Sequence, residues 1–313
     1  MDVNTELRAF LRTRRARLTP EAVGLPSFGE RRRVPGLRRE ELAQLAGVSF
    51  DYYVRLEQGR SRNVSESVLD AVAGALQLTA AERAHLFNLA RPTAPRGRAE
   101  RAVRIRPGLR RLVETITATP AFIVDRRSEV LAWNALAAAL IGDFDAMAPR
   151  QRNFARFLFL DERARSLYPD WDKAARESVA SLRMAAGRDP DDPVLNELIG
   201  ELSVKSEAFR RWWADHDVRE KTYGTKRYRH PVAGEMTVAY EALQLPADPG
   251  LTLMLYTVEA GSPSEAAMQR LVSLVESRRR HAGRADASDH LAVDEPSARV
   301  PDVGTEDPDP PGA

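Results

Sequence analysis

The chain has 313 residues, more than one typical domain, and its 43% hydrophobic and 29% charged residues are ordinary for a globular protein. No apolar run is long enough to span a membrane, and the first residues lack the apolar core of a signal peptide. With no cysteine, the chain can form neither disulfides nor thiolate metal sites. We therefore expect a cytoplasmic protein with no membrane association, no metal and no cofactor.

The formal net charge of +2 conceals an uneven distribution. Arginine is concentrated in the first third of the chain, whereas residues 284–313 carry eight acidic residues and only two arginines. A basic end and an acidic tail are typical of a nucleic-acid-binding protein. A GC-rich genome would also favour arginine over lysine, so scattered arginines carry little weight, and those beside a DNA-binding motif carry more.

Residues 1–91 predict a compact domain of short helices. Residues 4–17 have the apolar spacing of an amphipathic helix. Ser65 is positioned to cap another helix, and Thr79 with Glu82 forms a capping box for the next. This density of helix starts predicts an all-α fold.

Residues 37–60 (LRREELAQLAGVSFDYYVRLEQGR) have the pattern of two helices joined by a sharp turn. Gly47 can take the left-handed conformation that such a turn needs, and Ser49 can cap the second helix. Tyr53 and Leu56 share one face of that helix. The pattern predicts a helix-turn-helix, whose second helix lies in the DNA major groove. An ordinary helical hairpin or a dimerisation module is the alternative.

This segment resembles the XRE family of lambda-repressor-like regulators. The matching residues are Glu41, Leu42, Ala43, Gln44, Gly47, Val48, Ser49, Leu56, Glu57 and Gly59. The resemblance implies that the domain binds double-stranded DNA. The candidate DNA-contacting residues are Arg38, Arg39, Ser49, Phe50, Asp51, Tyr52, Arg55, Arg60 and Arg62.

Among these candidates, the resemblance assigns base reading to Phe50, Asp51 and Arg55. It assigns phosphate contact to Arg39 and to the segment after Gly59. Arginine can pair with guanine through two hydrogen bonds, and an aromatic ring can meet a thymine methyl group. Tyr52 fits a packing role equally well. Phe50 replaces the polar residue of the best-known phage repressors, so the DNA sequence is not predicted by analogy.

The rest of the chain changes character. Residues 92–107 (PTAPRGRAERAVRIRP) predict a basic linker, and residues 281–313 a disordered acidic tail. Between them, residues 108–280 contain a hairpin, a series of helices, further alternating strands and a final helix. This order predicts an α+β domain with an antiparallel sheet.

This second domain resembles the ligand-binding domain of actinobacterial MmyB-like regulators. The matching pieces are VDRRSEVLAWN, RNFARFLF, DWDKAARESVASLR, DDPVLNELIGEL, SEAFRRWWADHDV and RHPVAGEMTVAYEAL. The resemblance implies a PAS-like fold with a pocket for a fatty-acid-like or other small apolar molecule. The candidate ligand-binding residues are Trp133, Asn134, Phe157, Arg183, Trp213, His230 and Tyr240. Arg183 or His230 could hold a carboxylate, although such aromatic residues are more often core residues and Asn134 could simply cap a helix.

Three functions remain after these observations. The first is a homodimeric transcriptional regulator that responds to a small ligand. The second is a regulator controlled by a protein partner, in which the pocket is only core. The third, an enzyme with an accessory DNA-binding domain, lacks support because five scattered histidines form no catalytic or metal-binding pattern.

Overall fold

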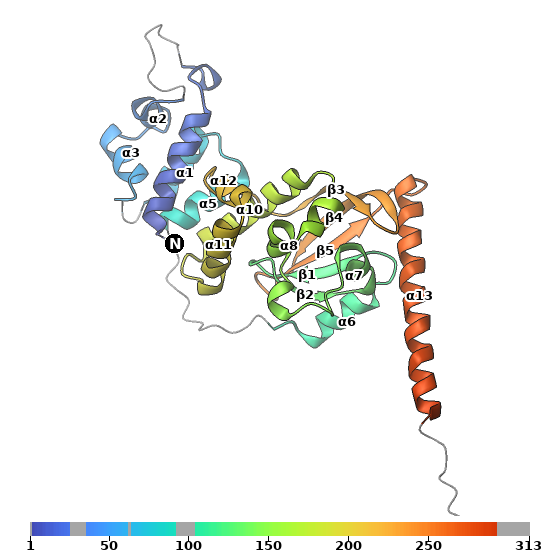
Figure 1. The fold of residues 1–313 in the computed structure, drawn as a ribbon. Helices are drawn as coiled ribbons and strands as arrows, with labels where there is room; N and C mark the ends of the chain where they lie inside the picture. The colour runs from blue at the N-terminus through green and yellow to red at the C-terminus, as the bar shows by residue number, and fades with distance from the viewer. Residues whose placement is uncertain (1, 26–35, 62–63, 92–103, 293–313) are drawn as a thin grey trace, which may run out of the picture. The chain divides into compact units, whose positions relative to one another are not determined.

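The computed structural model describes residues 2–25, 36–61, 64–91 and 104–292, with side chains through residue 281 (Figure 1). Arg62, residues 92–103 of the predicted linker and residues 293–313 of the predicted tail lie outside the described residues. Within the described part, no helix is both long enough and apolar enough to cross a membrane.

The N-terminal part is helical, as predicted. Its elements are α1 (Val3–Arg17), η1 (Glu21–Val23), α2 (Arg39–Leu45), α3 (Phe50–Glu57), α4 (Glu66–Ala75) and α5 (Ala80–Ala90). Side chains of Asp2, Ser49, Ser65 and Thr79 cap α1, α3, α4 and α5 by accepting hydrogen bonds from first-turn amides. One apolar core built from Phe10, Leu42, Tyr53 and other buried side chains joins these helices.

The turn between α2 and α3 depends on a glycine. Gly47 has a φ of +64°, in the left-handed region that other L-residues seldom adopt. Its amide donates to the Gln44 carbonyl at 3.1 Å, which closes the end of α2. The predicted helix-turn-helix geometry is therefore present.

The second part combines helices with one sheet. Its elements are α6 (Pro107–Thr115), β1 (Ala121–Val124), β2 (Val130–Trp133), α7 (Ala135–Ile141), η2 (Pro149–Gln151), α8 (Phe154–Leu160), α9 (Glu162–Leu167), α10 (Trp171–Arg188), α11 (Pro193–Lys205), α12 (Glu207–Trp213), β3 (Tyr223–His230), β4 (Gly234–Gln244), β5 (Thr252–Thr257) and α13 (Pro263–Ala292). The predicted α+β class with an antiparallel sheet is confirmed.

The sheet has the order β2-β1-β5-β4-β3 with every pair antiparallel (Figure 1). Its two faces have different surroundings. The α6 face buries Leu109 and Val113 against Ala121 and Ile123 of β1. The opposite face presents the next residue of β1, Phe122, because side chains alternate along a strand. That second face is the one that encloses the pocket described below.

One helix and two element boundaries differ from the sequence predictions. Helix α9 was not predicted, because six residues are too few for a clear helical period. Strand β3 begins at Tyr223, three residues before the segment KRYRH (residues 226–230) that the sequence predicts as a strand. Helix α13 continues to Ala292, so residues 281–292 are helical and are not part of a disordered tail. The alanines among these residues favour a helix, and the prolines of the tail begin only at Pro296.

Candidate DNA-binding surface and ligand pocket

Helix α3 presents a polar and aromatic face to solvent. The Ser49 hydroxyl accepts a hydrogen bond from the Tyr52 amide at 3.2 Å and so fixes the start of the helix. Tyr53 and Leu56 are fully buried, whereas Phe50, Asp51 and Arg55 are exposed. Phe50 keeps 43% of its surface exposed, which is unusual for a large apolar side chain. An exposed row at the N-terminal end of the second helix is what base reading in a major groove requires.

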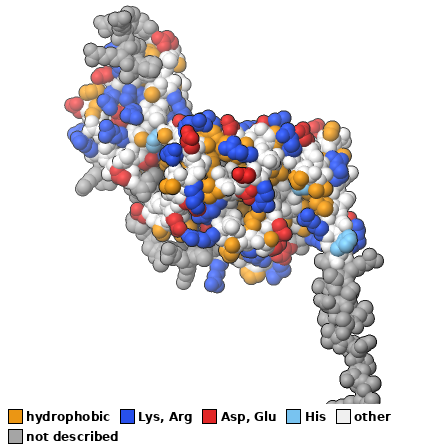
Figure 2. All heavy atoms as spheres, viewed as in Figure 1, with side chains coloured by type: hydrophobic (Ala, Val, Ile, Leu, Met, Phe, Trp, Pro, Cys, Tyr) orange, Lys and Arg blue, Asp and Glu red, His pale blue; other side chains and the backbone are white. Residues whose placement is uncertain are grey.

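The other described DNA-contact candidates differ in exposure. Arg38 and Arg60 are exposed, and Tyr52 is half-buried, as its packing alternative requires. Arg39 is not a free cation, since its Nε donates to the Glu57 carboxylate and this hydrogen bond raises the Arg39 pKa. Figure 2 shows blue Lys and Arg side chains on the helical domain that holds α1–α3 and on the rest of the visible face.

Glu57 is a buried carboxylate at the end of α3. It is 1% exposed and lies 3.0 Å from the Arg15 Nε of α1, 3.5 Å from the Tyr53 hydroxyl, and beside Arg39 of α2. Arg15 also donates to the Leu37 carbonyl at 2.6 Å. Glu57 therefore fixes α3 to both neighbouring helices. The sequence analysis missed this role, although a carboxylate next to Leu56 on the buried side of an amphipathic helix was the available signal.

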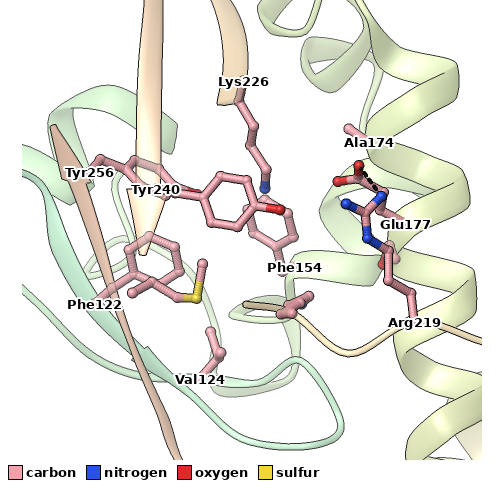
Figure 3. A pocket seen from close by; sticks show the side chains of 12 residues that line it. Phe122, Val124, Phe154, Ala174, Glu177, Arg219, Lys226, Tyr240 and Tyr256 are labelled. Carbon is pink, nitrogen blue, oxygen red and sulfur yellow. Dashed lines mark hydrogen bonds and ion pairs between the residues drawn. The ribbon is translucent and has the colours of Figure 1, made fainter. Parts of the chain in front are cut away.

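A pocket lies between the inner face of the sheet and α10 (Figure 3). It holds about 520 Å³ of empty space, counting the open solvent at its mouth. The lining residues are Phe122, Val124, Phe154, Ala174, Glu177, Ser178, Arg219, Lys221, Lys226, Tyr240, Met254 and Tyr256. The sheet and α8 supply the aromatic wall, and Glu177, Ser178, Arg219, Lys221 and Lys226 supply most of the polar groups.

The charges in this pocket are mostly positive. Arg219 donates to the Glu177 carboxylate at 2.7 Å, which leaves two lysines without an ion-pair partner among the described residues. The Lys226 Nζ lies 5.1 Å from the centres of both the Phe154 and Tyr240 rings. Burial, with the nearby Lys221 charge adding to it, lowers the pKa of Lys226 to about 7. Burial also lowers the Lys221 pKa. The pocket thus combines an aromatic wall with ammonium groups that have no carboxylate.

The comparisons with known families agree with this division. Residues 105–271, more than half of the chain, match the MmyB-like transcription regulator ligand binding domain. Residues 6–86 match a helix-turn-helix domain. The chain belongs to the MmyB-like transcription regulators. The comparison with curated proteins found no match for it.

Of the seven ligand-binding candidates in this MmyB-like regulator, Tyr240 lines the pocket. Trp133 lies beside Phe144 and donates its indole N–H to Asp145 at 3.3 Å. Phe157 packs against Phe154 and Tyr168 in the neighbouring aromatic core. Neither of these two side chains is among the residues that line the pocket.

Asn134 and His230 form hydrogen bonds with backbone groups. The Asn134 carboxamide caps α7 by accepting from the Ala137 amide at 2.8 Å, the alternative role that the sequence left open. The His230 Nδ1 accepts from the Val232 and Ala233 amides, so its Nε2 donates to the Ala139 carbonyl at 2.9 Å. These bonds occupy both ring nitrogens, and His230 is not among the residues that line the pocket.

Arg183 and Trp213 also lie outside the pocket. Arg183 is fully buried, with its guanidinium carbon 4.0 Å from the centre of the Trp213 ring. It pairs with Glu6 of the helix-turn-helix domain, so its carboxylate partner belongs to the protein. The expectation that Arg183 holds a ligand carboxylate is therefore corrected: the partner came from a segment distant in sequence, which local patterns do not reveal.

The pocket lysines were not among the residues predicted from the sequence. Lys226 lies opposite Val238 in the β3–β4 ladder, so it points to the buried face of the sheet with Tyr228. A lysine at an inward position of an alternating strand was the signal that could have identified it. Among the residues that the structure describes, no cluster of histidine and acidic side chains could hold a metal ion.

Proposed function

We propose that this regulator recognises a specific sequence in double-stranded DNA through α3, and that a small apolar molecule with an acidic group controls this recognition from the pocket. A fatty acid is the simplest molecule of this class. The observation that supports the ligand class is the pair of unpartnered lysines beside an aromatic wall. The protein acts in the cytoplasm. It acts as a homodimer, because helix-turn-helix domains read two-fold symmetric sites as dimers.

Electrostatics supports an anionic ligand. Burying an ammonium group without a counter-ion is unfavourable, and for this reason the pKa of the half-buried Lys226 is lowered. A ligand carboxylate between Lys221 and Lys226 would form charge-assisted hydrogen bonds and remove the penalty. The apolar remainder would lie on Phe122, Phe154 and Tyr256. An uncharged ligand would leave the lysines as they are.

The direct test of the function has two steps. Sites are first selected from random duplexes with purified protein, and the affinity for the selected site is compared with that for shuffled DNA at several salt concentrations. The titration is then repeated with dodecanoate as a probe. We expect sequence-specific binding whose affinity changes with dodecanoate. Equal affinity for selected and shuffled DNA would contradict the DNA part, and an unchanged affinity at saturating dodecanoate would contradict the ligand part.

Replacing Arg55 with alanine is expected to reduce the discrimination between selected and shuffled DNA by about 1–3 kcal/mol, the value of one good base contact. The side chain is exposed, so the thermal stability should not change. Arg163→Ala, which removes an exposed arginine from α9, is the matched control and should leave discrimination intact. Equal discrimination by Arg55→Ala and wild type would exclude Arg55 from base reading.

Replacing Lys226 with methionine is expected to weaken dodecanoate binding about tenfold or more, as the loss of a charge-assisted hydrogen bond requires. Because the free pocket holds the Lys226 pKa at about 7, a bound carboxylate should raise it, and binding near pH 8 should take up a proton. Affinity should therefore fall as the pH rises above about 7. Calorimetry in two buffers with different ionisation enthalpies measures the uptake.

The control for this variant is Lys205→Met, on the exposed face of α11, where the lysine pairs with Glu201 at 2.8 Å. It should bind dodecanoate and take up the proton as wild type does. Lys226→Met should fold with undiminished stability, since it removes an unfavourably buried cation. Proton uptake that persists in Lys226→Met would assign the titrating group elsewhere.

A further inference from the structure

The segment of residues 214–222, here called the connecting segment, joins α12 to β3 and contacts two functional sites. At its start, the His216 carbonyl accepts a hydrogen bond from Arg14 of α1 at 2.5 Å. Asp217 pairs with Arg17 and lies 3.6 Å from Arg14. Val218 packs against the core of the helix-turn-helix domain. Three successive residues thus hold the DNA-binding domain.

The end of the same segment belongs to the pocket. Arg219 and Lys221 are both lining residues, and Arg219 makes the ion pair with Glu177 that Figure 3 draws. The Arg219 amide also donates to the Ala180 carbonyl of α10 at 3.3 Å. Val218 therefore contacts the core of the helix-turn-helix domain, and the next residue, Arg219, contacts the Glu177 carboxylate in the pocket. Because Val218 and Arg219 are consecutive, a displacement of Arg219 also displaces Val218 unless the backbone dihedral angles between them change.

Helix α10 connects the two sites a second time. Glu177 and Ser178 line the pocket, and Arg183 and Gly187, farther along the helix, meet the DNA-binding domain. Arg183 is fully buried and pairs with Glu6, while it donates to the Trp213 carbonyl at the end of α12. The His216 Nδ1 lies 3.0 Å from the same Glu6 carboxylate.

The contact at Gly187 leaves no spare space. A Cβ added there would lie 2.4 Å from two ring atoms of His85 on α5. The His85 ring is fully buried and packs edge-on against Phe10 at 5.1 Å, and among the described residues neither of its nitrogens has a hydrogen-bond partner. Burial lowers the His85 pKa to about 3, so the ring is neutral here. The interface is therefore a close-packed surface that fits in one arrangement.

Helix α1 extends the connection to the recognition helix. It contributes Glu6, Arg14 and Arg17 to the contacts above, and Arg15 from the same helix pairs with Glu57 at the end of α3. Since Glu57 is buried, α3 cannot shift independently of α1.

We propose that the connecting segment and α10 couple the pocket to the DNA-binding domain: an anion in the pocket loosens the contact of α1 and α5 with α10. This inference rests on the proposed function for its ligand. The bound carboxylate competes with Glu177 for Arg219 and attracts Lys221, so it draws the segment toward the pocket and away from Arg14 and Arg17. By thermodynamic reciprocity, a loosened contact raises the affinity for the anion.

Two pairs of variants test this coupling. Gly187→Ala inserts a methyl group against His85, and Gly200→Ala makes the same change on α11, where no atom lies within 4 Å of the added Cβ. Asp217→Asn weakens the ion pairs to Arg14 and Arg17, whereas Asp215→Asn changes an aspartate of the same segment that pairs with Arg176 of α10. The second pair removes no packing atoms, so it remains informative if Gly187→Ala folds poorly.

The measurement is amide hydrogen exchange on the full-length protein without added ligand. We expect Gly187→Ala and Asp217→Asn to accelerate exchange in α1 and α5 and also in residues 219–226, with β1 and β2 unchanged. The two control variants should match wild type. Faster exchange in α1 and α5 with unchanged exchange in residues 219–226 would overturn the coupling, because the two sites would then be independent.

A second arm adds dodecanoate. It should protect residues 219–226 and accelerate exchange in α1 of the wild type, and Asp217→Asn should bind it severalfold more tightly. Protection of the pocket with no change in α1, or an unchanged affinity in Asp217→Asn, would also overturn the coupling. Absence of protection anywhere would refute the proposed ligand class, and the ligand-free arm would still decide the coupling.

Discussion

Replacing Glu57 with alanine is expected to lower the free energy of unfolding of the helix-turn-helix domain by about 3–5 kcal/mol, the usual cost of removing one partner of a buried ion pair. Arg15 is 12% exposed and would lose this carboxylate, although it still donates to the Leu37 carbonyl. The Tyr53 hydroxyl would also lose its acceptor in a fully buried position. Burial already holds the Tyr53 pKa above its usual range, so the phenol cannot ionise to compensate.

This loss should also abolish DNA binding, because α3 would no longer be fixed to α1 and α2. Urea denaturation followed by circular dichroism measures the first effect, and titration of the selected duplex measures the second. Glu66→Ala is the matched control: Glu66 lies at the start of α4 and pairs with Arg91 at the surface, so its removal should cost less than about 1 kcal/mol. A comparable small loss in Glu57→Ala would contradict the structural role assigned to Glu57.

The features that could be predicted from sequence are those that depend on near neighbours. Ser49, Ser65 and Thr79 cap helices because a hydroxyl reaches an amide three residues later, wherever the rest of the chain lies. Gly47 adopts its positive φ for the same local reason. The β1–β2 hairpin and the alternation of β4 were likewise readable from spacing.

The pocket could not be predicted in this way, because its residues come from elements far apart in the chain. Phe122, Glu177 and Lys226 meet only after β5 has paired with β1 and α10 has packed on the sheet. The guanidinium of Arg183, predicted to hold a ligand carboxylate, instead pairs with Glu6, which is distant in the sequence. The residue types indicated which side chains could form polar contacts, but the partner of each side chain depends on the tertiary structure.

The second large effect is expected at Glu6. Glu6→Ala should destabilise the protein by about 3 kcal/mol, because it leaves the fully buried Arg183 guanidinium without its carboxylate. The loss should lie at the low end of the range for broken buried pairs. Arg183 retains the Trp213 carbonyl and lies 3.1 Å from the His216 Nδ1, so part of its charge stays solvated by protein dipoles.

The double variant Glu6→Leu with Arg183→Met separates the charge from the packing. Replacing both partners by apolar side chains of similar volume removes the desolvation cost along with the attraction, so its stability should return to within about 1 kcal/mol of wild type. Urea denaturation of the single variant, the double variant and wild type provides the comparison. Glu197→Ala, which breaks the exposed pair with Arg150, should have little effect and controls for the loss of a surface carboxylate.

The double variant also tests what the pair contributes beyond stability. The apolar pair should keep α1 packed on α10, yet it removes the one carboxylate that both Arg183 and the His216 ring contact. If polar contacts convey pocket occupancy, this stable variant should bind the selected DNA with an affinity that no longer depends on dodecanoate. If close packing at Gly187 and Val218 suffices, the dependence should persist. A double variant as unstable as Glu6→Ala would mean that the destabilisation comes from lost packing at α1, and the buried charge would then have no part in it.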